Sequence, residues 1–201
     1  MKQNYLNYII LFLIIILREP IMQNINNIMY IRNNKLEIET LKKQNKTLKE
    51  EYNNLLTFKN NIKIENNYII SNTIKTNYNF NKLNINGKHH INDEVINENG
   101  LIGIITKTNN NFSEMTYIYN TNLPIKINDI NGKILTKDKD NNLIIGELTN
   151  HNNINLFDSV YSMFNTYIGK VIKIKQNDLD TKIIVKTPLI NNINYVAVIK
   201  R

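Results

Sequence analysis

The side chains that most often carry chemistry are scarce in this 201-residue chain. Cysteine is absent, which excludes disulfides, cysteine-ligated zinc, iron–sulfur clusters and a thiol nucleophile. The three histidines are His89, His90 and His151. They form no helical His-x-x-x-His pair, and no carboxylate cluster accompanies them at ligand spacing. We therefore predict surface histidines and no metal site.

The order of histidine, aspartate and serine residues along the chain would allow one class of enzyme, a serine hydrolase. The candidate order of histidine, aspartate and serine is His89 or His90, then Asp129 or Asp138, then Ser159 or Ser162. A nucleophilic serine needs a tight turn that presents its hydroxyl beside oxyanion-hole amides. No glycine flanks either serine, and the six glycines of the chain form no phosphate-binding loop. We therefore predict no catalytic residue and no cofactor.

Two further features could indicate binding, one of calcium and one of nucleic acid. Asp138, Asp140 and Asn142 alternate like calcium ligands, but no glycine or closing glutamate follows at the EF-hand positions. We predict a polar hairpin tip there. The net charge is +8 and the isoelectric point is about 9.4, but the lysines are scattered and no nucleic-acid-binding motif accompanies them. We predict a solvated lysine-rich surface and no nucleic-acid partner.

The amino-terminal segment is the first element of the chain. Residues Tyr5–Leu17 are almost entirely apolar, and Ile21 and Met22 extend a run that falls short of the about 20 residues that cross a bilayer. The alternative is a cleaved signal peptide, which needs a small-residue cleavage site that Arg18–Pro20 does not supply. We predict a transmembrane signal anchor over residues 1–22, with the amino terminus in the cytoplasm and the remainder outside the membrane.

A heptad repeat follows the anchor. From residue 31 to residue 62 the repeat has no glycine or proline. Asn45 stands at an a position, where asparagine specifies register and dimer state, and Glu37 and Lys42 are placed to pair between parallel chains. We predict that residues 23–66 form a coiled-coil homodimer; the alternative is a single amphipathic helix packed on its own β domain. The predicted seam residues are Ile31, Ile38, Leu41, Asn45, Leu48, Tyr52, Leu55 and Ile62.

The remainder of the chain has the two-residue period of β-strands. Short β-branched segments alternate with Asn-rich turns, which predicts an all-β module over residues 67–201, formed by two small β-barrel subdomains. Asn99-Gly100 and Asn131-Gly132 are predicted hairpin turns. The predicted strands are Tyr68–Ile74, Glu94–Asn97, Leu101–Thr106, Glu114–Tyr119, Ile125–Asn128, Lys133–Thr136, Leu143–Leu148, Ser159–Met163, Ile168–Lys175, Lys182–Lys186 and Tyr195–Ile199. The predicted fold is therefore mainly β, with a transmembrane helix and a coiled-coil helix preceding two barrels.

Six motifs in the β region resemble the rod-shape-determining protein MreC family, in the order in which that family has them. They are Asn84–Ile96, Gly100–Ile105, Asn120–Ile127, Gly132–Leu148, Tyr167–Val171 and Asn194–Val198. The order of anchor, coil and β region is also similar to that family. The resemblance implies structural roles for Gly87, Gly100, Gly103, Pro124, Gly132, Gly169 and Tyr195.

Two segments depart from the family pattern. Residues Phe157–Met163 stand where the family has G-D-x-V-x-T-S-G, so that both glycines and the threonine are missing. The F-P-k-G loop of the family is reduced here to Phe164–Thr166. A partner or self-association surface in that loop would be altered in this chain.

The resemblance implies a scaffold rather than an enzyme. It implies a bitopic membrane protein, dimeric through its coil, that controls cell shape and links MreB filaments, through MreD, to the transpeptidase and glycosyltransferase of peptidoglycan synthesis. It also implies paired barrels arranged like a chymotrypsin-type protease without the protease chemistry. One alternative is an adaptor of a membrane-fusion-type exporter, although its coil is a hairpin inserted into the β module and the helix here precedes all strands. The other alternative is a serine hydrolase-like β-barrel protein.

Overall fold

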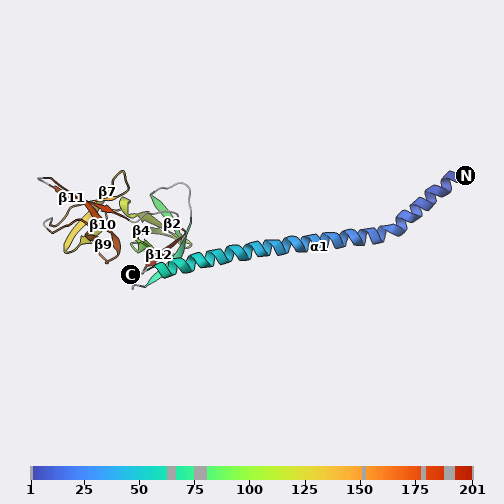
Figure 1. Ribbon diagram of the computed structural model, residues 1–201, viewed down its shortest axis with the longest axis horizontal. Helices are drawn as coiled ribbons and strands as arrows, with labels where there is room; N and C mark the ends of the chain where they lie inside the picture. Colours follow the sequence, from blue (N-terminus) through green and yellow to red (C-terminus); the bar gives the residue numbers. More distant parts are fainter. Residues whose placement is uncertain are drawn as a thin grey trace. The chain divides into compact units, whose positions relative to one another are not determined.

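The computed structural model describes residues 2–62, 67–74, 81–150, 153–177, 180–187 and 193–200, and only the backbone at 2–11, 13–15, 21, 177 and 180. Within these residues, one long helix precedes twelve strands (Figure 1). The strands close into two six-stranded barrels, which confirms the prediction of a mainly β fold with two barrels after an N-terminal helix. The chain divides into two compact units, Met1–Asn54 and Leu55–Arg201.

Helix α1 extends from Lys2 to Asn61 and includes Pro20. It is continuous across the predicted boundary between anchor and coil, although a proline lacks the N–H that an interior helical residue donates. The backbone N–H of Ile62 still donates to the carbonyl of Phe58 at 3.2 Å. The described helix ends at Asn61, and residues 63–66, the last of the predicted coil, lie outside the described residues.

The predicted anchor is only partly covered by the structure. Most side chains of Tyr5–Leu17 lie outside those described. In the part of the chain that is described, no helix combines the length and the apolar character that a membrane span requires.

Barrel 1 is built from the two ends of the β region. Its order is β1-β12-β3-β4-β5-β2, closed by pairing of β2 with β1. All of its strand pairs are antiparallel, and the last strand of the chain lies between the first and the third. The strands are β1 Tyr68–Ile74, β2 Lys82–Asn86, β3 Glu94–Asn97, β4 Gly100–Thr108, β5 Phe112–Tyr117 and β12 Tyr195–Ile199.

Barrel 2 is inserted between β5 and β12. A short 3-10 helix, η1 Ile118–Asn120, leads into it, and its strands follow the closed order β10-β11-β8-β7-β6-β9. These pairs are also antiparallel. The strands are β6 Pro124–Ile127, β7 Ile130–Lys137, β8 Leu143–Gly146, β9 Ser159–Ser162, β10 Tyr167–Asn177 and β11 Asp180–Lys186.

Alternation along the strands directs β-branched side chains into two hydrophobic clusters. One cluster fills barrel 1, with Ile85, Ile102 and Met115 fully buried. The other fills barrel 2 and continues into barrel 1, where Ile96 and Leu101 belong to it. A shared apolar cluster therefore joins the two barrels.

Local patterns predicted most elements correctly. Each of the eleven predicted strands overlaps an observed one, and Tyr68–Ile74, Glu94–Asn97 and Tyr195–Ile199 match without change. Strand β2 was not predicted, and within it only Ile85 is fully buried. The end of predicted strand Glu114–Tyr119 is instead the 3-10 helix η1.

One predicted turn lies one residue earlier than predicted, and the other is wrong. Gly100 opens β4 directly after the turn at residues 98–99. Asn131-Gly132, however, lies inside β7, and the turn is formed by Asn128 and Asp129. The pairing of Ile127 with Ile130 closes a two-residue loop there, and Asn128 adopts the positive φ of 51° that such a loop needs.

Candidate functional site: the helix seam and the barrel junction

The predicted seam residues from Ile31 to Tyr52 lie on α1 and expose their apolar side chains. Leu48 is 62% exposed and Tyr52 is 64% exposed, and Ile31, Ile38 and Leu41 are also exposed. Repeated large apolar side chains on a polar surface mark a site for another chain. The spacing of these residues is that of a two-stranded coiled coil.

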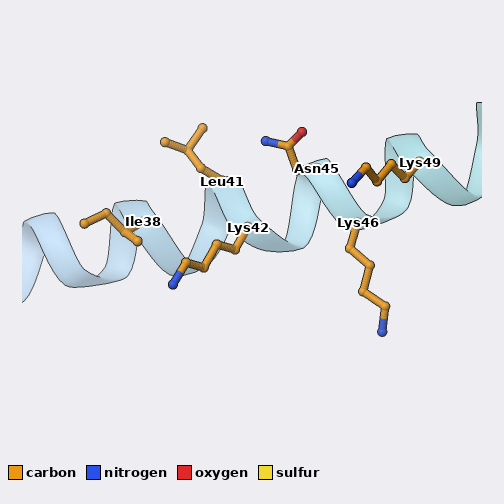
Figure 2. A pocket seen from close by; sticks show the side chains of 6 residues that line it. All are labelled: Ile38, Leu41, Lys42, Asn45, Lys46 and Lys49. Carbon is orange, nitrogen blue, oxygen red and sulfur yellow. The ribbon is translucent and has the colours of Figure 1, made fainter.

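The middle of the predicted seam carries a shallow groove. The groove is lined by Ile38, Leu41, Lys42, Asn45, Lys46 and Lys49 (Figure 2). In Figure 2, Leu41 and Asn45 project from one side of the helix and Lys46 from the opposite side. In a parallel coil, an apolar d side chain inserts into a hole formed by four residues of the facing helix. The first four lining residues hold the heptad positions a, d, e and a, which form such a hole.

The charges beside the seam favour a parallel pair. Between Ile31 and Tyr52 the e positions are basic and the g positions are acidic or neutral: Lys35, Lys42 and Lys49 at e, and Glu37, Gln44 and Glu51 at g. Parallel helices place g of one chain beside e of the other, whereas antiparallel helices place e beside e. Charges at e and g set partner choice and orientation, and only the parallel arrangement here brings opposite charges together.

The carboxyl-terminal turns of α1 contact barrel 1 instead of solvent. Phe58 is 6% exposed and belongs to the hydrophobic cluster that contains Ile96 and Leu101. Its ring lies 6.0 Å from the ring of Tyr195, centroid to centroid, and Ile62 packs against the same cluster. The alternative prediction, of a helix packed on its own β domain, therefore holds for this end of α1.

The residues that the family resemblance singled out are spread over both barrels. Gly87 and Gly103 belong to barrel 1, Pro124 and Gly132 belong to barrel 2, and Tyr195 contacts the helix. They lie at separate places in the described part of the fold and form no common site there. The remaining two, Gly100 and Gly169, are positions of close backbone approach: a Cβ on Gly169 would overlap the carbonyl oxygen of Lys186, and one on Gly100 would lie 2.6 Å from the carbonyl oxygen of Tyr167.

A buried polar contact crosses the junction of the barrels. Glu94 of β3 is 1% exposed, and its Oε2 accepts a hydrogen bond from the hydroxyl of Thr166, which precedes β10. This pair was not predicted from sequence. The available signal was a glutamate at the start of an apolar strand, because a charge is buried only when it is hydrogen-bonded.

The histidine predictions are only partly correct. His90 is exposed, as predicted. His89 is buried, contrary to the prediction, and its Nε2 lies 3.2 Å from the hydroxyl of Ser71 and 3.2 Å from the carbonyl oxygen of Asn86. His151 lies outside the described residues. Over the described ranges, no three His, Cys, Asp or Glu side chains form a group that could hold a metal ion.

The serine and aspartate candidates have structural partners. The Ser162 hydroxyl accepts hydrogen bonds from the backbone N–H groups of Phe164 and Thr166, at 3.1 and 3.2 Å, and so closes the turn after β9. Ser159 pairs with Lys170 in the sheet, and Asp129 is an exposed turn residue. His89 contacts Ser71 and Asn86, whereas Ser162 contacts Phe164 and Thr166, so each side chain is engaged in its own local contacts.

The predicted hairpin tip at Asp138 is confirmed. Its carboxylate accepts hydrogen bonds from the backbone N–H groups of Asp140 and Asn142, both at 2.9 Å, and from the Asn142 side-chain amide at 3.0 Å. The side-chain bond from Asn142 is the main cause that lowers the pKa of Asp138. Local hydrogen bonds of this kind define a turn and need no ion.

An N-terminal helix followed by two closed six-stranded β barrels defines the class of protein to which this chain belongs, a double-barrel protein with a long helix before the barrels. Residues 69–200 match the family described as rod shape-determining protein MreC, barrel core. The chain belongs to the MreC family.

Solved structures of this family share the fold. The major periplasmic domain of the cell shape-determining filament MreC, in its monoclinic form, has a TM-score of 0.59 at 20% identity and covers 67% of this chain and 98% of its own. MreC of Listeria monocytogenes has a TM-score of 0.62 at 19% identity and covers 87% of this chain and 92% of its own. A chain from the complex between Penicillin-Binding Protein (PBP2) and MreC of Helicobacter pylori has a TM-score of 0.51 at 14% identity and covers 67% and 100%. A search of curated proteins gave no match.

Proposed function

We propose that this protein is a membrane-anchored homodimeric scaffold that controls cell shape by organising peptidoglycan synthesis outside the cytoplasmic membrane. The observation that carries the proposal is the exposed heptad seam of α1 on a chain whose barrels belong to the MreC family. The protein acts by binding and positioning other proteins and needs neither a catalytic residue nor a cofactor.

The apolar run Tyr5–Leu17 supports the membrane anchor. An anchor here places the amino terminus in the cytoplasm and the seam and barrels on the other side of the membrane. A relative is described as a periplasmic domain, which agrees with that orientation.

Family membership and one relative support the choice of partners. MreC of Helicobacter pylori forms a complex with Penicillin-Binding Protein (PBP2). By analogy, the barrels of this protein bind the transpeptidase and glycosyltransferase of elongation, and its amino-terminal region connects them through MreD to MreB. Two parallel chains would present two barrel modules to these enzymes.

Depletion in the native host with cell shape scored by microscopy tests the proposal. We expect depleted cells to lose their normal shape and the wild-type chain to restore it. The Leu41→Ala/Leu48→Ala chain should not restore shape, whereas Lys43→Ala, which changes an exposed f position, should restore it fully. Unchanged shape on depletion would refute the cell-shape role.

A further inference from the structure

We propose that a second copy of this chain pairs only with the seam from Ile31 to Tyr52, and that barrel 1 of the same chain takes the place of the partner helix from Leu55 onward. This inference rests on the proposed dimer and sets its length. It predicts that the two chains separate between Tyr52 and Leu55.

The burial of the apolar side chains changes along a single repeat of the helix. Leu48 and Tyr52 are 62% and 64% exposed, as expected of side chains that await a partner. Leu55 is half-buried and Phe58 is 6% exposed. Within one heptad, the apolar side chains of the helix change from exposed to covered.

The covered side chains lie on the same face of the helix as the predicted seam. Leu55 and Ile62 occupy d positions of the same repeat, and Phe58 occupies the neighbouring g position. Phe58 and Ile62 pack on the cluster that contains Ile96 and Leu101 of barrel 1. A parallel two-stranded coil needs the d positions of both chains to face each other across its axis. Barrel 1 fills that space beside Ile62, so a partner helix cannot also fill it.

Polar contacts tie the same turns to barrel 1. The Asn61 side-chain amide donates to Oε2 of Glu98 at 3.2 Å, and Glu98 lies in the turn between β3 and β4. The Phe58 and Tyr195 rings lie 6.0 Å apart, within the range of favourable aromatic pairs. The contact between helix and barrel thus has an apolar centre and a polar edge.

The sequence features that favour pairing stop at the same point. The lysines at the e positions end with Lys49, and the next e position is Leu56, which cannot pair with the Glu51 of a second chain. The next a position is Lys59 in place of an apolar residue. Asn53 and Asn54 lie between the two segments, and the boundary between the compact units falls after Asn54.

Because the chain contains no cysteine, single-cysteine variants of the full chain can locate the end of the seam. Disulfide formation requires the two Cα atoms to lie within about 7 Å, a condition that d positions of a parallel pair meet. The variants are Leu41→Cys, Leu48→Cys, Leu55→Cys, Lys59→Cys and Ile62→Cys, with Lys43→Cys as the exposed control. Each is oxidised in cells and the dimer fraction is read on a non-reducing gel.

We expect strong cross-linking at 41 and 48, and roughly tenfold less at 55, 59 and 62, as at the control. Lys59 is exposed, so its variant tests the last heptad without disturbing the contact of Phe58 with barrel 1. Equal cross-linking at 48, 55, 59 and 62 would show that the coil continues, which overturns this inference and leaves the dimer standing. Failure at 41 and 48 as well would overturn both the dimer and the inference.

Discussion

The Thr166 hydroxyl donates a hydrogen bond to Oε2 of Glu94 across the junction of the two barrels, and both side chains are buried. Glu94 belongs to β3 of barrel 1, whereas Thr166 stands in the loop before β10 of barrel 2. A buried carboxylate is tolerated only with hydrogen-bond donors around it. This pair therefore links the two barrels at a position where breaking the contact has a measurable cost.

Replacing Thr166 with valine should destabilise the protein. Valine keeps the shape but removes the donor, and a hydrogen bond to a charged group contributes about 1.5–3 kcal/mol. Urea unfolding should show a loss of that size. Thr166→Ser, which keeps the hydroxyl, is the control and should lose much less. Equal stability of Thr166→Val and wild type would show that this contact contributes nothing.

Replacing Phe157 with glycine should stabilise the protein. Phe157 has a φ of 71° and a side chain that is 71% exposed, so the backbone is strained and little burial is lost on truncation. A left-handed residue with a Cβ costs roughly 1–2 kcal/mol, and the entropy of glycine offsets part of the relief. We expect a net gain of about 0.5–1 kcal/mol in urea unfolding.

The matched control for that prediction is Phe157→Ala, which removes the ring but keeps the Cβ. It should give no gain, because the positive φ remains unfavourable for alanine. The backbone hydrogen bond from Phe157 to the carbonyl of Val171, 2.8 Å long, is available to all three residues. A gain in both variants would attribute the effect to the exposed ring instead of the backbone.

Replacing Gly100 with alanine should be strongly destabilising. Its φ of 142° is rare for residues with a side chain, and the new Cβ would lie 2.6 Å from the carbonyl oxygen of Tyr167. We expect a loss of about 2 kcal/mol or more in urea unfolding, since strain alone costs about 1–3 kcal/mol. Asn99→Ala, at the preceding exposed position, should change stability by less than about 0.5 kcal/mol. A small effect at Gly100 would mean that the barrels can separate slightly there.

Replacing Leu48 with alanine should weaken dimerisation of the full chain. Leu48 is a predicted d residue, and loss of a leucine from an apolar interface costs about 2–5 kcal/mol. Sedimentation velocity in detergent should show at least about a tenfold higher dissociation constant. Thr47→Ala, at an exposed c position of the same turn, should leave the constant unchanged. A monomeric wild-type chain at tens of micromolar concentration would contradict the dimer itself.

Replacing Asn142 with alanine should raise the pKa of Asp138. The lowered pKa of this carboxyl results first from the Asn142 side-chain hydrogen bond and to a smaller extent from Lys175 and backbone N–H groups. Because the folded-state pKa is depressed, its contribution to the hairpin is present above the ordinary value of 3.8 and disappears as the pH falls through the lowered pKa. An NMR titration of the Asp138 carboxyl checks this, with Lys175→Ala expected to give a smaller rise.

Features that depend on a local period were predictable from the sequence. The heptad spacing of Ile31 to Tyr52 and the alternation in Tyr68–Ile74 each arise within a few residues. The turn beside Gly100 was likewise predictable, because it depends on the conformational preferences of adjacent residues. The resemblance to the MreC family followed from motifs of the same short range.

Features that depend on residues far apart in the chain were not predictable. Asn131-Gly132 has the composition of a turn but lies inside β7, where Asn131 accepts a backbone hydrogen bond from Thr149 and Lys133 pairs with Gly146 of β8. His89 is buried because Ser71 of β1 lies beside it. A short pattern contains no information about which distant segment covers it.

The sequence by itself determined that an amphipathic helix precedes a β module, since hydrophobic period and turn chemistry are local properties. Only the tertiary structure decided that β12 closes barrel 1 between β1 and β3, and that Glu94 meets Thr166 across the junction. It also decided that residues at the same heptad position have different environments along the helix. Leu48 and Ile62 hold the same heptad position, yet one is exposed and the other packs on barrel 1. A side chain is buried when other atoms fill the space beside it. Barrel 1 supplies such atoms only beside the carboxyl-terminal end of the helix.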